Sequence, residues 1–435
     1  MSNPKSKRIL INLAIVFTLI VGTLIGIQFA KGYRPNIENG SIEGNGLLSI
    51  TSYPKSARVF INGKLTTLTD DKLYLSPTNY QIKIEKDGFH PWNKNVPLKP
   101  ELVSSIDARL FPIIPATTPI TFYQASNVSI SPDGTKIAYV VSKSPIPADD
   151  GLYIYSLSNN LLGSQNTQIT GSEKDYTKAL LVWAPDNNQI LAIFTEKLKS
   201  GEKISSSHLL STKSMNQIKT LTDATLKLPQ IIAEWQDKHA KINQPTLSLY
   251  PKYMVDVLTG KSINVYFSPD KERVFYTPTE NLALPENAVG KALPNINSAQ
   301  ESRDILKGST YVYDLKEGTN YQITLASPSS EIVKNLITTQ SATPSASLLA
   351  IKQLKAQTES RYSTNTSWYG NRHLIQTTKD GVYITEYDNL NPTLISQATI
   401  KENFIAPSPD ASKLLLLTNI NQKPEAFNLI SLDLK

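Results

Sequence analysis

The sequence contains no cysteine, and this absence excludes disulfide bonds, thiolate nucleophiles and cysteine-ligated zinc. Histidine is also scarce, because the 435 residues include only His90, His208, His239 and His373. These four lie far apart in the chain, and none has a second histidine or a carboxylate at the spacing of metal ligands. We therefore expect no metal site.

Motifs for catalysis and cofactor binding are missing as well. The chain has no G-x-S-x-G nucleophile elbow of the kind that hydrolases use. Residues 258–262 are similar to the end of a phosphate-binding loop, but Val255 stands where that loop requires its first glycine. The sequence therefore predicts no catalytic residue and no cofactor.

The formal net charge is +7, but the excess of basic residues lies at the N-terminus. Residues 1–34 contain five basic side chains and no acidic one, whereas the rest of the chain carries 39 basic and 37 acidic residues. The sequence has no stripe of Lys and Arg interleaved with aromatic residues, which a nucleic-acid surface requires. We expect no nucleic-acid partner.

One long apolar run extends from Ile9 to Ala30 and matches the roughly 20 residues that a helix needs to cross the hydrocarbon core. Three basic side chains precede it and two follow closely, which favours a cytoplasmic N-terminus. The run is long for a signal peptide and ends without a small-x-small cleavage site, so we favour an uncleaved anchor over a signal peptide. Residues 1–31 are thus predicted to be a cytoplasmic tip and a single-pass anchor in the cell membrane, with an extracytoplasmic ectodomain.

Residues 32–45 lack apolar periodicity and contain several turn residues, which predicts a linker. Residues 46–112 follow as short alternating strands separated by Gly, Pro, Asn and Asp turns, which predicts a compact β unit. Within it, Asn62-Gly63 is a hairpin signal, because this dipeptide readily takes positive φ angles.

This β unit resembles the PEGA domain family. The resemblance is carried by a strand ending at Pro54, the Asn62-Gly63 hairpin, a strand starting at Tyr80, and the turn Lys86-Asp87-Gly88-Phe89. It implies a small β-sandwich of the type found on exported and surface proteins, with Asn62, Gly63 and Gly88 as turn residues. It implies no catalytic residues.

A recurring element dominates the remainder of the chain. Each copy has a short apolar run, a polar turn with Pro-Asp, and a second apolar run; copies begin at 127, 180, 264 and 404, and a degenerate copy covers 364–378. The turn residues are Pro132, Asp133, Gly134, Pro185, Asp186, Pro269, Asp270, Gly370, Pro409 and Asp410. Pro presets its φ angle, Asp accepts backbone hydrogen bonds within the turn, and Gly takes a positive φ angle. We expect these residues to form turns and to bind no ligand.

Two further strands follow most copies, and four strands per unit are typical of a propeller blade. The element resembles the WD40-like repeats of the TolB type, and the order of anchor, PEGA-like unit and repeats resembles that of membrane-anchored bacterial PEGA proteins. We predict an all-β fold in which residues 113–435 form a propeller of five blades, with room for a sixth in residues 222–258. Residues 120–124 are expected to complete the last blade.

Long insertions separate the repeats, and those at 223–240 and 346–359 show helical spacing of apolar residues. Loops on a rigid scaffold often carry binding sites. We expect a non-enzymatic binding or scaffold protein of the bacterial cell envelope, whose propeller binds an envelope protein or a cell-wall polysaccharide through loops 278–307 and 327–359.

Two alternatives remain open from the sequence. A propeller-type hydrolase or lyase acting on glycans needs paired carboxylates, for which the candidates are Glu234, Asp237, Glu301 and Asp304. A TolB-like factor in envelope assembly is the other alternative. Trp183, Trp235 and Trp368 have side chains suited to stacking on glycans, but we favour core packing because strands are rich in aromatic residues.

Overall fold

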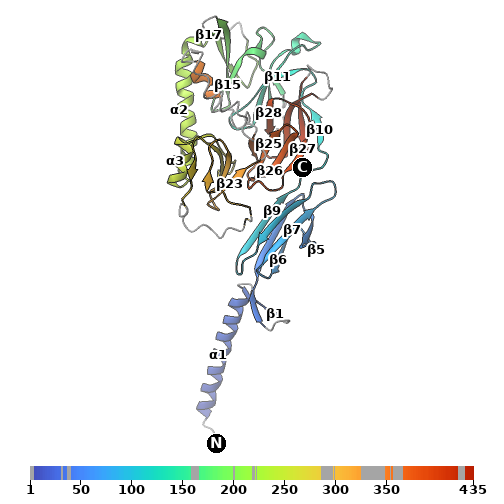
Figure 1. Cartoon of the computed structure of the whole chain (residues 1–435), viewed down its shortest axis with the longest axis vertical. Coiled ribbons are helices and arrows are strands. Elements are labelled where there is room, and N and C mark those ends of the chain that lie inside the picture. Colours follow the sequence, from blue (N-terminus) through green and yellow to red (C-terminus); the bar gives the residue numbers. More distant parts are fainter. Residues whose placement is uncertain are drawn as a thin grey trace. The chain divides into compact units, whose positions relative to one another are not determined.

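The computed structural model describes residues 4–30, 33–36, 41–157, 166–198, 201–217, 221, 223–285, 297, 299–324, 348–352, 354–355, 366–419 and 427–435. The chain divides into two compact units. The N-terminal unit comprises Met1–Phe111 with Pro294–Ser298, and the repeat unit comprises Pro112–Leu293 with Ala299–Lys435. Both units are mostly β-structure, and the N-terminal unit begins with an apolar helix (Figure 1).

Helix α1 (Pro4–Ala30) opens the N-terminal unit. Its mean hydropathy is 2.1 over Ile11–Gln28, and none of this stretch is buried against the rest of the chain. The helix is long and apolar enough to cross a membrane, and a signal sequence has the same length and composition.

An antiparallel hairpin lies within the segment that we expected to be a linker. Its strands are β1 (Tyr33–Asn36) and β2 (Ser41–Gly44), and Tyr33 pairs with Gly44. The Tyr33 ring lies so close to Gly44 that a Cβ atom there would come within 3.2 Å of it. The Tyr33 hydroxyl donates a hydrogen bond of 2.6 Å to Glu101 Oε1. The hairpin therefore connects the chain after α1 to the β-sheets of this unit.

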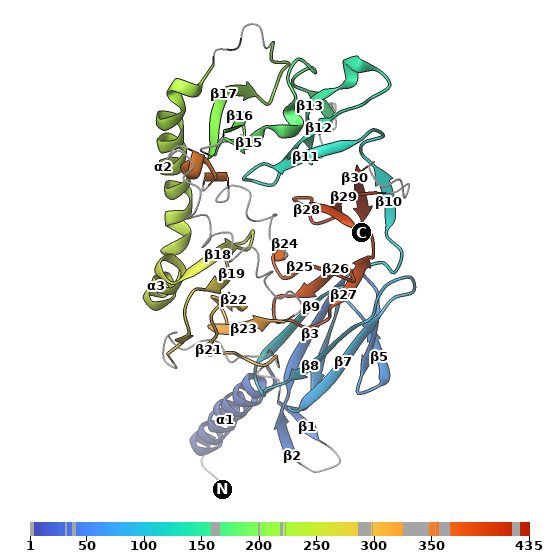
Figure 2. The ribbon, with the colours of Figure 1, turned by 45° about the horizontal axis from the view of Figure 1, so that its top comes forward.

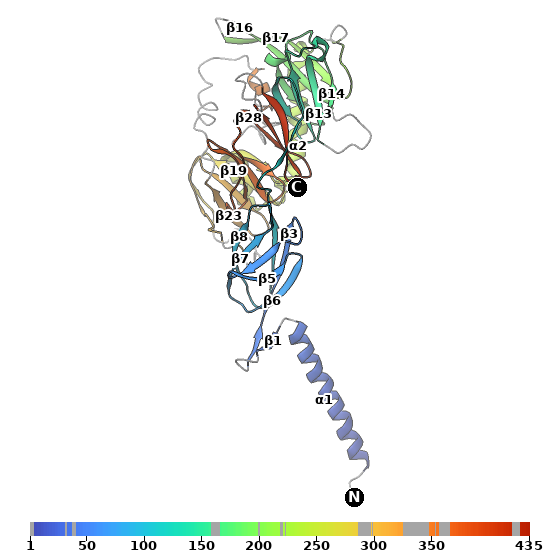
Figure 3. The ribbon, with the colours of Figure 1, turned by 90° about the vertical axis from the view of Figure 1, so that its right-hand side faces the viewer.

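Two sheets form the body of the N-terminal unit, with strand orders β6-β3-β9 and β5-β4-β7-β8 (Figure 3). The strands are β3 (Gly46–Tyr53), β4 (Arg58–Ile61), β5 (Lys64–Leu68), β6 (Asp71–Leu75), β7 (Asn79–Glu85), β8 (Trp92–Pro97) and β9 (Val103–Arg109). Because side chains alternate between the faces of a strand, Ile50, Ile82 and Ile106 point into one shared core. The two sheets thus form a β-sandwich.

Among the described residues, five antiparallel sheets of three or four strands follow one another in the repeat unit (Figure 2). The first contains β11 (Ala125–Ile130), β12 (Lys136–Val141), β13 (Gly151–Ser156) and β14 (Asn166–Gln168), and the second contains β15 (Leu180–Trp183), β16 (Gln189–Leu198) and β17 (Gly201–Ser211). The third contains β18 (Ser262–Phe267), β19 (Arg273–Pro278), β22 (Thr310–Asp314) and β23 (Thr319–Ile323), and the fourth contains β24 (Thr366–Tyr369), β25 (His373–Thr378), β26 (Gly381–Glu386) and β27 (Thr393–Ser396).

The fifth sheet joins the two ends of the repeat unit. It contains β28 (Ile400–Pro407), β29 (Lys413–Thr418), β30 (Asn428–Asp433) and, from the start of the unit, β10 (Ala116–Pro119). Strand β10 pairs antiparallel with β30, with Thr118 opposite Ser431. The closing strand therefore precedes the one expected at 120–124, although the backbone N–H of Ile120 still donates to Leu429 O at 2.8 Å.

Three pairs of neighbouring sheets share buried side chains. The first and second sheets share a core that contains Leu152 and Trp183, and the third and fourth share one that contains Phe275 and Leu374. The fifth and first sheets share a core that contains Leu415 and Tyr139. The last sheet therefore packs against the first.

Helices cover the second and third sheets. Helix α2 (Leu228–Leu247) packs Ile232 and Trp235 onto Leu191 of the second sheet, and α3 (Lys252–Gly260) packs Met254 onto Tyr276 of the third. Residues 348–352 and 354–355 are also helical, in agreement with the apolar spacing there. The sixth blade considered for residues 222–258 is therefore wrong, because the apolar residues of this segment recur at helical spacing.

The repeat unit also contains several short elements. They are the 3-10 helices η1 (Pro147–Asp149), η2 (Tyr176–Lys178) and η4 (Thr225–Lys227) and the paired strands β20 (Leu282–Ala283) and β21 (Asp304–Ile305). Residues 218–220 and 222, which would belong to a fourth strand of the second sheet, lie outside the described residues. Of the loops expected to bind, residues 286–296, 298, 327–347, 353 and 356–359 lie outside them as well.

Candidate functional site

Three of the five repeat turns share one arrangement of a serine and an aspartate. In the first copy, Ser131 Oγ donates to Asp133 Oδ1 at 2.6 Å and accepts from the backbone N–H of Lys136 at 2.9 Å. Asp133 Oδ1 also accepts from the backbone N–H of Thr135 at 3.0 Å. Gly134 has a φ angle of 74°, which is the left-handed conformation that favours glycine.

The third and last copies repeat this geometry. Ser268 Oγ donates to Asp270 Oδ1 at 2.5 Å, and Ser408 Oγ donates to Asp410 Oδ1 at 2.7 Å. Partial burial acts to raise the pKa of Asp410, but hydrogen bonds from Ser408 and Ser412 outweigh it and hold the pKa well below its usual range. These aspartates are therefore engaged within their own turns.

The other two copies differ in the turn. Ala184 replaces the serine in the second copy, where Asp186 Oδ1 accepts from the backbone N–H of Asn188 at 3.1 Å. In the degenerate copy, Tyr369 pairs with His373, and Gly370 has a φ angle of 66° in the short turn between them.

Contacts between turns of neighbouring sheets form a second repeated feature. Lys136 Nζ donates to Asn187 O in the turn of the second sheet at 3.0 Å. Arg273 Nη1 donates to Asn371 O in the turn of the fourth sheet at 3.3 Å. The sequence carried a signal for this feature, because a basic residue stands three positions after the aspartate of the first, third and last copies. Our reading of the sequence missed it.

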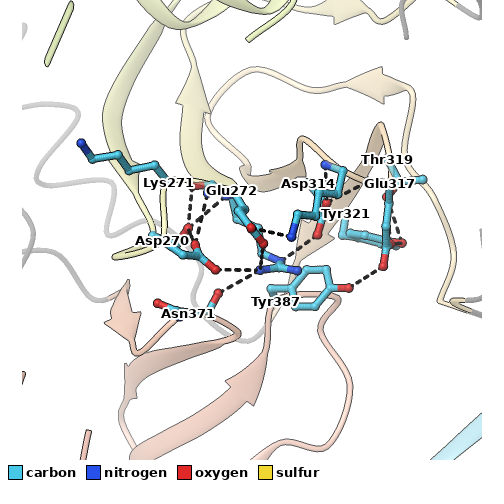
Figure 4. Close-up of polar contacts among 12 residues, drawn as sticks. Asp270, Lys271, Glu272, Asp314, Glu317, Thr319, Tyr321, Asn371 and Tyr387 are labelled. Carbon is cyan, nitrogen blue, oxygen red and sulfur yellow. Dashed lines mark hydrogen bonds and ion pairs between the residues drawn. The ribbon is translucent and has the colours of Figure 1, made fainter. Parts of the chain in front are cut away.

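Arg273 is the centre of a buried polar network between the third and fourth sheets. Its side chain is 7 % exposed, and its Nε lies 2.7 Å from Oδ2 of Asp314, whose side chain is fully buried. The guanidinium also stacks on the Tyr387 ring, 4.4 Å from the ring centroid. Asp314, Asn371 and Tyr387 thus all contact the Arg273 guanidinium group. Figure 4 shows these three residues gathered between the third and fourth sheets.

Glu317 extends this network. Tyr387 donates to Glu317 Oε1 at 2.9 Å, and Tyr321 donates to Glu317 Oε2 at 2.9 Å. Burial raises the pKa of Asp314 despite the neighbouring Arg273, and burial raises the pKa of Tyr387 well above its usual value. Because both charged oxygens of Glu317 and the guanidinium are engaged, the network is suited to holding two sheets together.

A smaller cluster joins Lys174, which precedes η2, to His208 on β17 of the second sheet. Lys174 Nζ lies 2.6 Å from His208 Nε2 and 3.3 Å from Ser206 Oγ. Because an ammonium group only donates, Nε2 accepts, and the buried Nδ1 then carries a proton for which the described residues provide no acceptor. Burial and the Lys174 charge lower the pKa of His208.

The carboxylates considered for catalysis do not converge. Glu234 and Asp237 both lie on α2 and form ion pairs of 2.7 and 2.6 Å with the lysines one helical turn later. Glu301 lies 2.9 Å from Arg303, and Asp304 is an exposed residue of β21. Among the described residues, no group of His, Asp and Glu is arranged to hold a metal ion.

The tryptophans considered for glycan stacking are buried. Trp183 donates its indole N–H to Ser129 Oγ at 2.9 Å, and Trp368 donates to Tyr266 O at 2.8 Å. Each bond reaches back to the preceding sheet, and Trp235 packs from α2 onto the second sheet. Core packing is therefore the role that the structure gives these side chains.

In the N-terminal unit, Asn62 and Gly63 form the turn between β4 and β5 with φ angles of 48° and 80°. Asn62 Oδ1 accepts from the backbone N–H of Gln81 at 2.9 Å, which links this turn to β7. Gly88 has a φ angle of 83° in the turn where the Phe89 N–H donates to Lys86 O.

These turns lie in a segment that a protein-family model recognises. Residues 45–113 match the PEGA domain family. The match extends one residue beyond each end of the expected 46–112. The PEGA domain covers less than half of the chain, so the match describes this segment alone.

Comparison of the whole chain adds little. No curated protein matches it. A crystal structure of a eukaryotic initiation factor is 10 % identical, with coverage of 90 % of this chain and 88 % of that chain, at a TM-score of 0.19. The Kuenenia stuttgartiensis hydrazine synthase is 8 % identical, with coverage of 86 % and 89 %, at a TM-score of 0.18. At such TM-scores these two structures carry no argument about fold or function.

Proposed function

We propose that this protein is a membrane-anchored scaffold of the bacterial cell envelope whose repeat unit is a five-bladed, TolB-like propeller that binds an envelope protein or a cell-wall polysaccharide. The pairing of β10 with β30 is the observation that carries the proposal. A strand from the start of the unit completes the last sheet, and the last sheet packs against the first. This arrangement suits a rigid ring that presents loops to a partner.

The chain leaves the sheets at two places that suit a binding role. Thirty-one residues separate β19 from β22, apart from the short β20–β21 pair, and forty-two residues separate β23 from β24. Both excursions start from the third sheet, which the Arg273 network holds to the fourth. Binding through loops held on a rigid frame is the general pattern.

A binding role is favoured over catalysis because the candidate carboxylates are either paired or isolated. Glu234 and Asp237 are bound by lysines on the solvent-facing side of α2, and Glu301 is bound by Arg303. The proposed membrane location rests on α1, whose apolar stretch is preceded by basic residues as cytoplasmic flanks usually are.

Cross-linking in intact cells tests the proposal. The bait is the full chain, and the first comparison is a variant without residues 113–435. The second comparison replaces residues 286–298 with a short Gly-Ser linker, which retains the β20–β21 pair because residues 282–283 and 304–305 stay in place. A specific partner retained by the full chain and lost by both variants supports the proposal.

Partners that persist without residues 113–435 would contradict the propeller as the binding platform. Turnover of glycans by the purified full chain in hydrolase and lyase assays would contradict the non-enzymatic part of the proposal. Loss of that turnover in Glu301→Gln would then identify the insertion as the active region.

A further inference from the structure

We propose that the anchor-proximal end of the PEGA domain lies in the lipid headgroup region of the membrane, with Leu47, Tyr74 and Val103 as the lipid-contacting residues. This inference rests on the proposed anchoring by α1. The partner of this apolar surface is the lipid of the membrane that α1 crosses. The inference goes beyond anchoring because a single-pass anchor on a long flexible linker would leave the domain free of the membrane.

The chain between the anchor and the domain is too short to separate them. Helix α1 ends at Ala30 and β1 begins at Tyr33, so the two residues between them, with their flanking bonds, span at most about 11 Å. Tyr33 is then fixed to the domain by its pairing with Gly44 and by its 2.6 Å hydrogen bond to Glu101. The end of the domain that carries Glu101 therefore stays near the end of the span.

Close backbone packing makes this connection rigid. A Cβ atom at Gly44 would come within 3.2 Å of the Tyr33 ring, and one at Gly46 would come within 2.5 Å of Leu98 Cγ and 2.7 Å of Lys99 O. The Glu101 N–H also donates to Asn45 O at 3.2 Å. The hairpin, the start of β3 and the segment before β9 are thus held together as one block.

Exposed apolar residues form a row at this end of the sandwich. Leu47 is opposite Tyr74 on β6 and opposite Val103 on β9, so the three lie side by side across the outer face of the sheet. Tyr74 is 51 % exposed and Val103 is 60 % exposed, whereas Leu47 lies between them and is half-buried.

The next row on the same face is polar. It consists of Ser49 with Lys72 and Ser105, two residues further along each strand. The outer face therefore changes from apolar to polar with distance from the anchor. A Tyr beside aliphatic residues is the composition that favours the membrane interface, because the ring partitions among headgroups while its hydroxyl stays hydrated.

The absence of native cysteine allows a clean test by site-specific labelling. Single variants Val103→Cys and Tyr74→Cys of the full chain are labelled with bimane and reconstituted into vesicles of phosphatidylcholine and phosphatidylglycerol. Headgroup-attached nitroxide lipids then report proximity by quenching. Leu68→Cys is the matched control, because Leu68 is also apolar and is 50 % exposed. It lies at the opposite end of the domain, since it pairs with Arg58, and Arg58 pairs with Glu85 at the far end of β7.

We expect at least about twofold stronger quenching at positions 103 and 74 than at 68, since interfacial contacts reach only about 5–10 Å into the headgroup boundary. Equal quenching at all three positions would overturn the proposal. A fourth label, Val16→Cys in α1, reports anchoring by itself with acyl-chain nitroxides. If the label at position 16 is quenched but the labels at positions 103 and 68 are quenched equally, the interfacial contact alone is overturned. If the label at position 16 is not quenched, the anchoring on which that contact rests is overturned.

Discussion

The Lys136 ammonium donates a hydrogen bond of 3.0 Å to the backbone oxygen of Asn187, so the turn of the first sheet is joined directly to the turn of the second. Partial burial lowers the pKa of Lys136, which is consistent with an ammonium group placed between two sheets. The same position after the turn holds Arg273 in the third sheet, where it contacts the fourth. One recurring basic residue thus connects sheets at two places.

Lys136→Met should lower the free energy of unfolding of the repeat unit by about 1–2 kcal/mol, because a charge-assisted hydrogen bond is lost while the aliphatic stem is kept. Lys413→Met is the matched control, since Lys413 occupies the same place after its turn but is exposed. Urea denaturation of both variants measures the difference. Equal losses would show that the contact to Asn187 adds no stability.

Arg273→Met should destabilise the repeat unit by about 3–5 kcal/mol, because it leaves the buried carboxylate of Asp314 without its cationic partner. The double variant Arg273→Met, Asp314→Leu should recover much of this loss, since both charges are then removed. Denaturation of the single and double variants gives the coupling energy. A double variant that is as unstable as the single one would place the cost in packing on Tyr387.

Thr118→Pro should weaken the closing sheet, because proline removes a backbone donor and Thr118 lies opposite Ser431 in the β10–β30 pair. We expect a loss of about 1–3 kcal/mol, with faster hydrogen exchange in β30. Ile114→Pro lies just before β10 at an exposed position and serves as the control. If exchange in β30 is the same for both variants, β10 does not hold the ends of the unit together.

The segment around His208 should lose protection as the pH falls from 7 towards 5. The folded pKa of His208 is lowered by burial and by Lys174, whereas the unfolded value is about 6.5. Below that value the unfolded chain binds more protons, so stability is present above it and decreases on acidification. Asp223, the other charged group facing this imidazole, acts in the opposite direction and limits the effect.

Hydrogen exchange followed by mass spectrometry at each pH measures this loss for the segment 201–211. His208→Gln keeps an acceptor for Lys174 and should flatten the pH dependence there. His90→Gln is the control, because burial lowers the pKa of His90 too, but this residue lies in the other unit. A pH dependence in 201–211 that survives His208→Gln would assign it to other groups.

Local patterns were sufficient for several features of this protein. A long apolar run predicts α1, and the turn residues at Asn62-Gly63 and Asp133-Gly134 predict tight turns, because each depends on a few neighbouring residues. The PEGA domain could be delimited to within one residue for the same reason. Apolar residues at helical spacing likewise predict α2.

Only the tertiary structure decided how distant segments meet. It placed residues 116–119, and not 120–124, on β30, put helices where a sixth blade had room, and brought Arg273 to Asp314 and Asn371. Strand pairing across more than 300 residues leaves no local periodicity, and neighbouring strands with similar composition compete for the same edge. The sequence by itself therefore determined the elements and their turns, and the packing of the sheets decided which side chains became buried, paired and rigid.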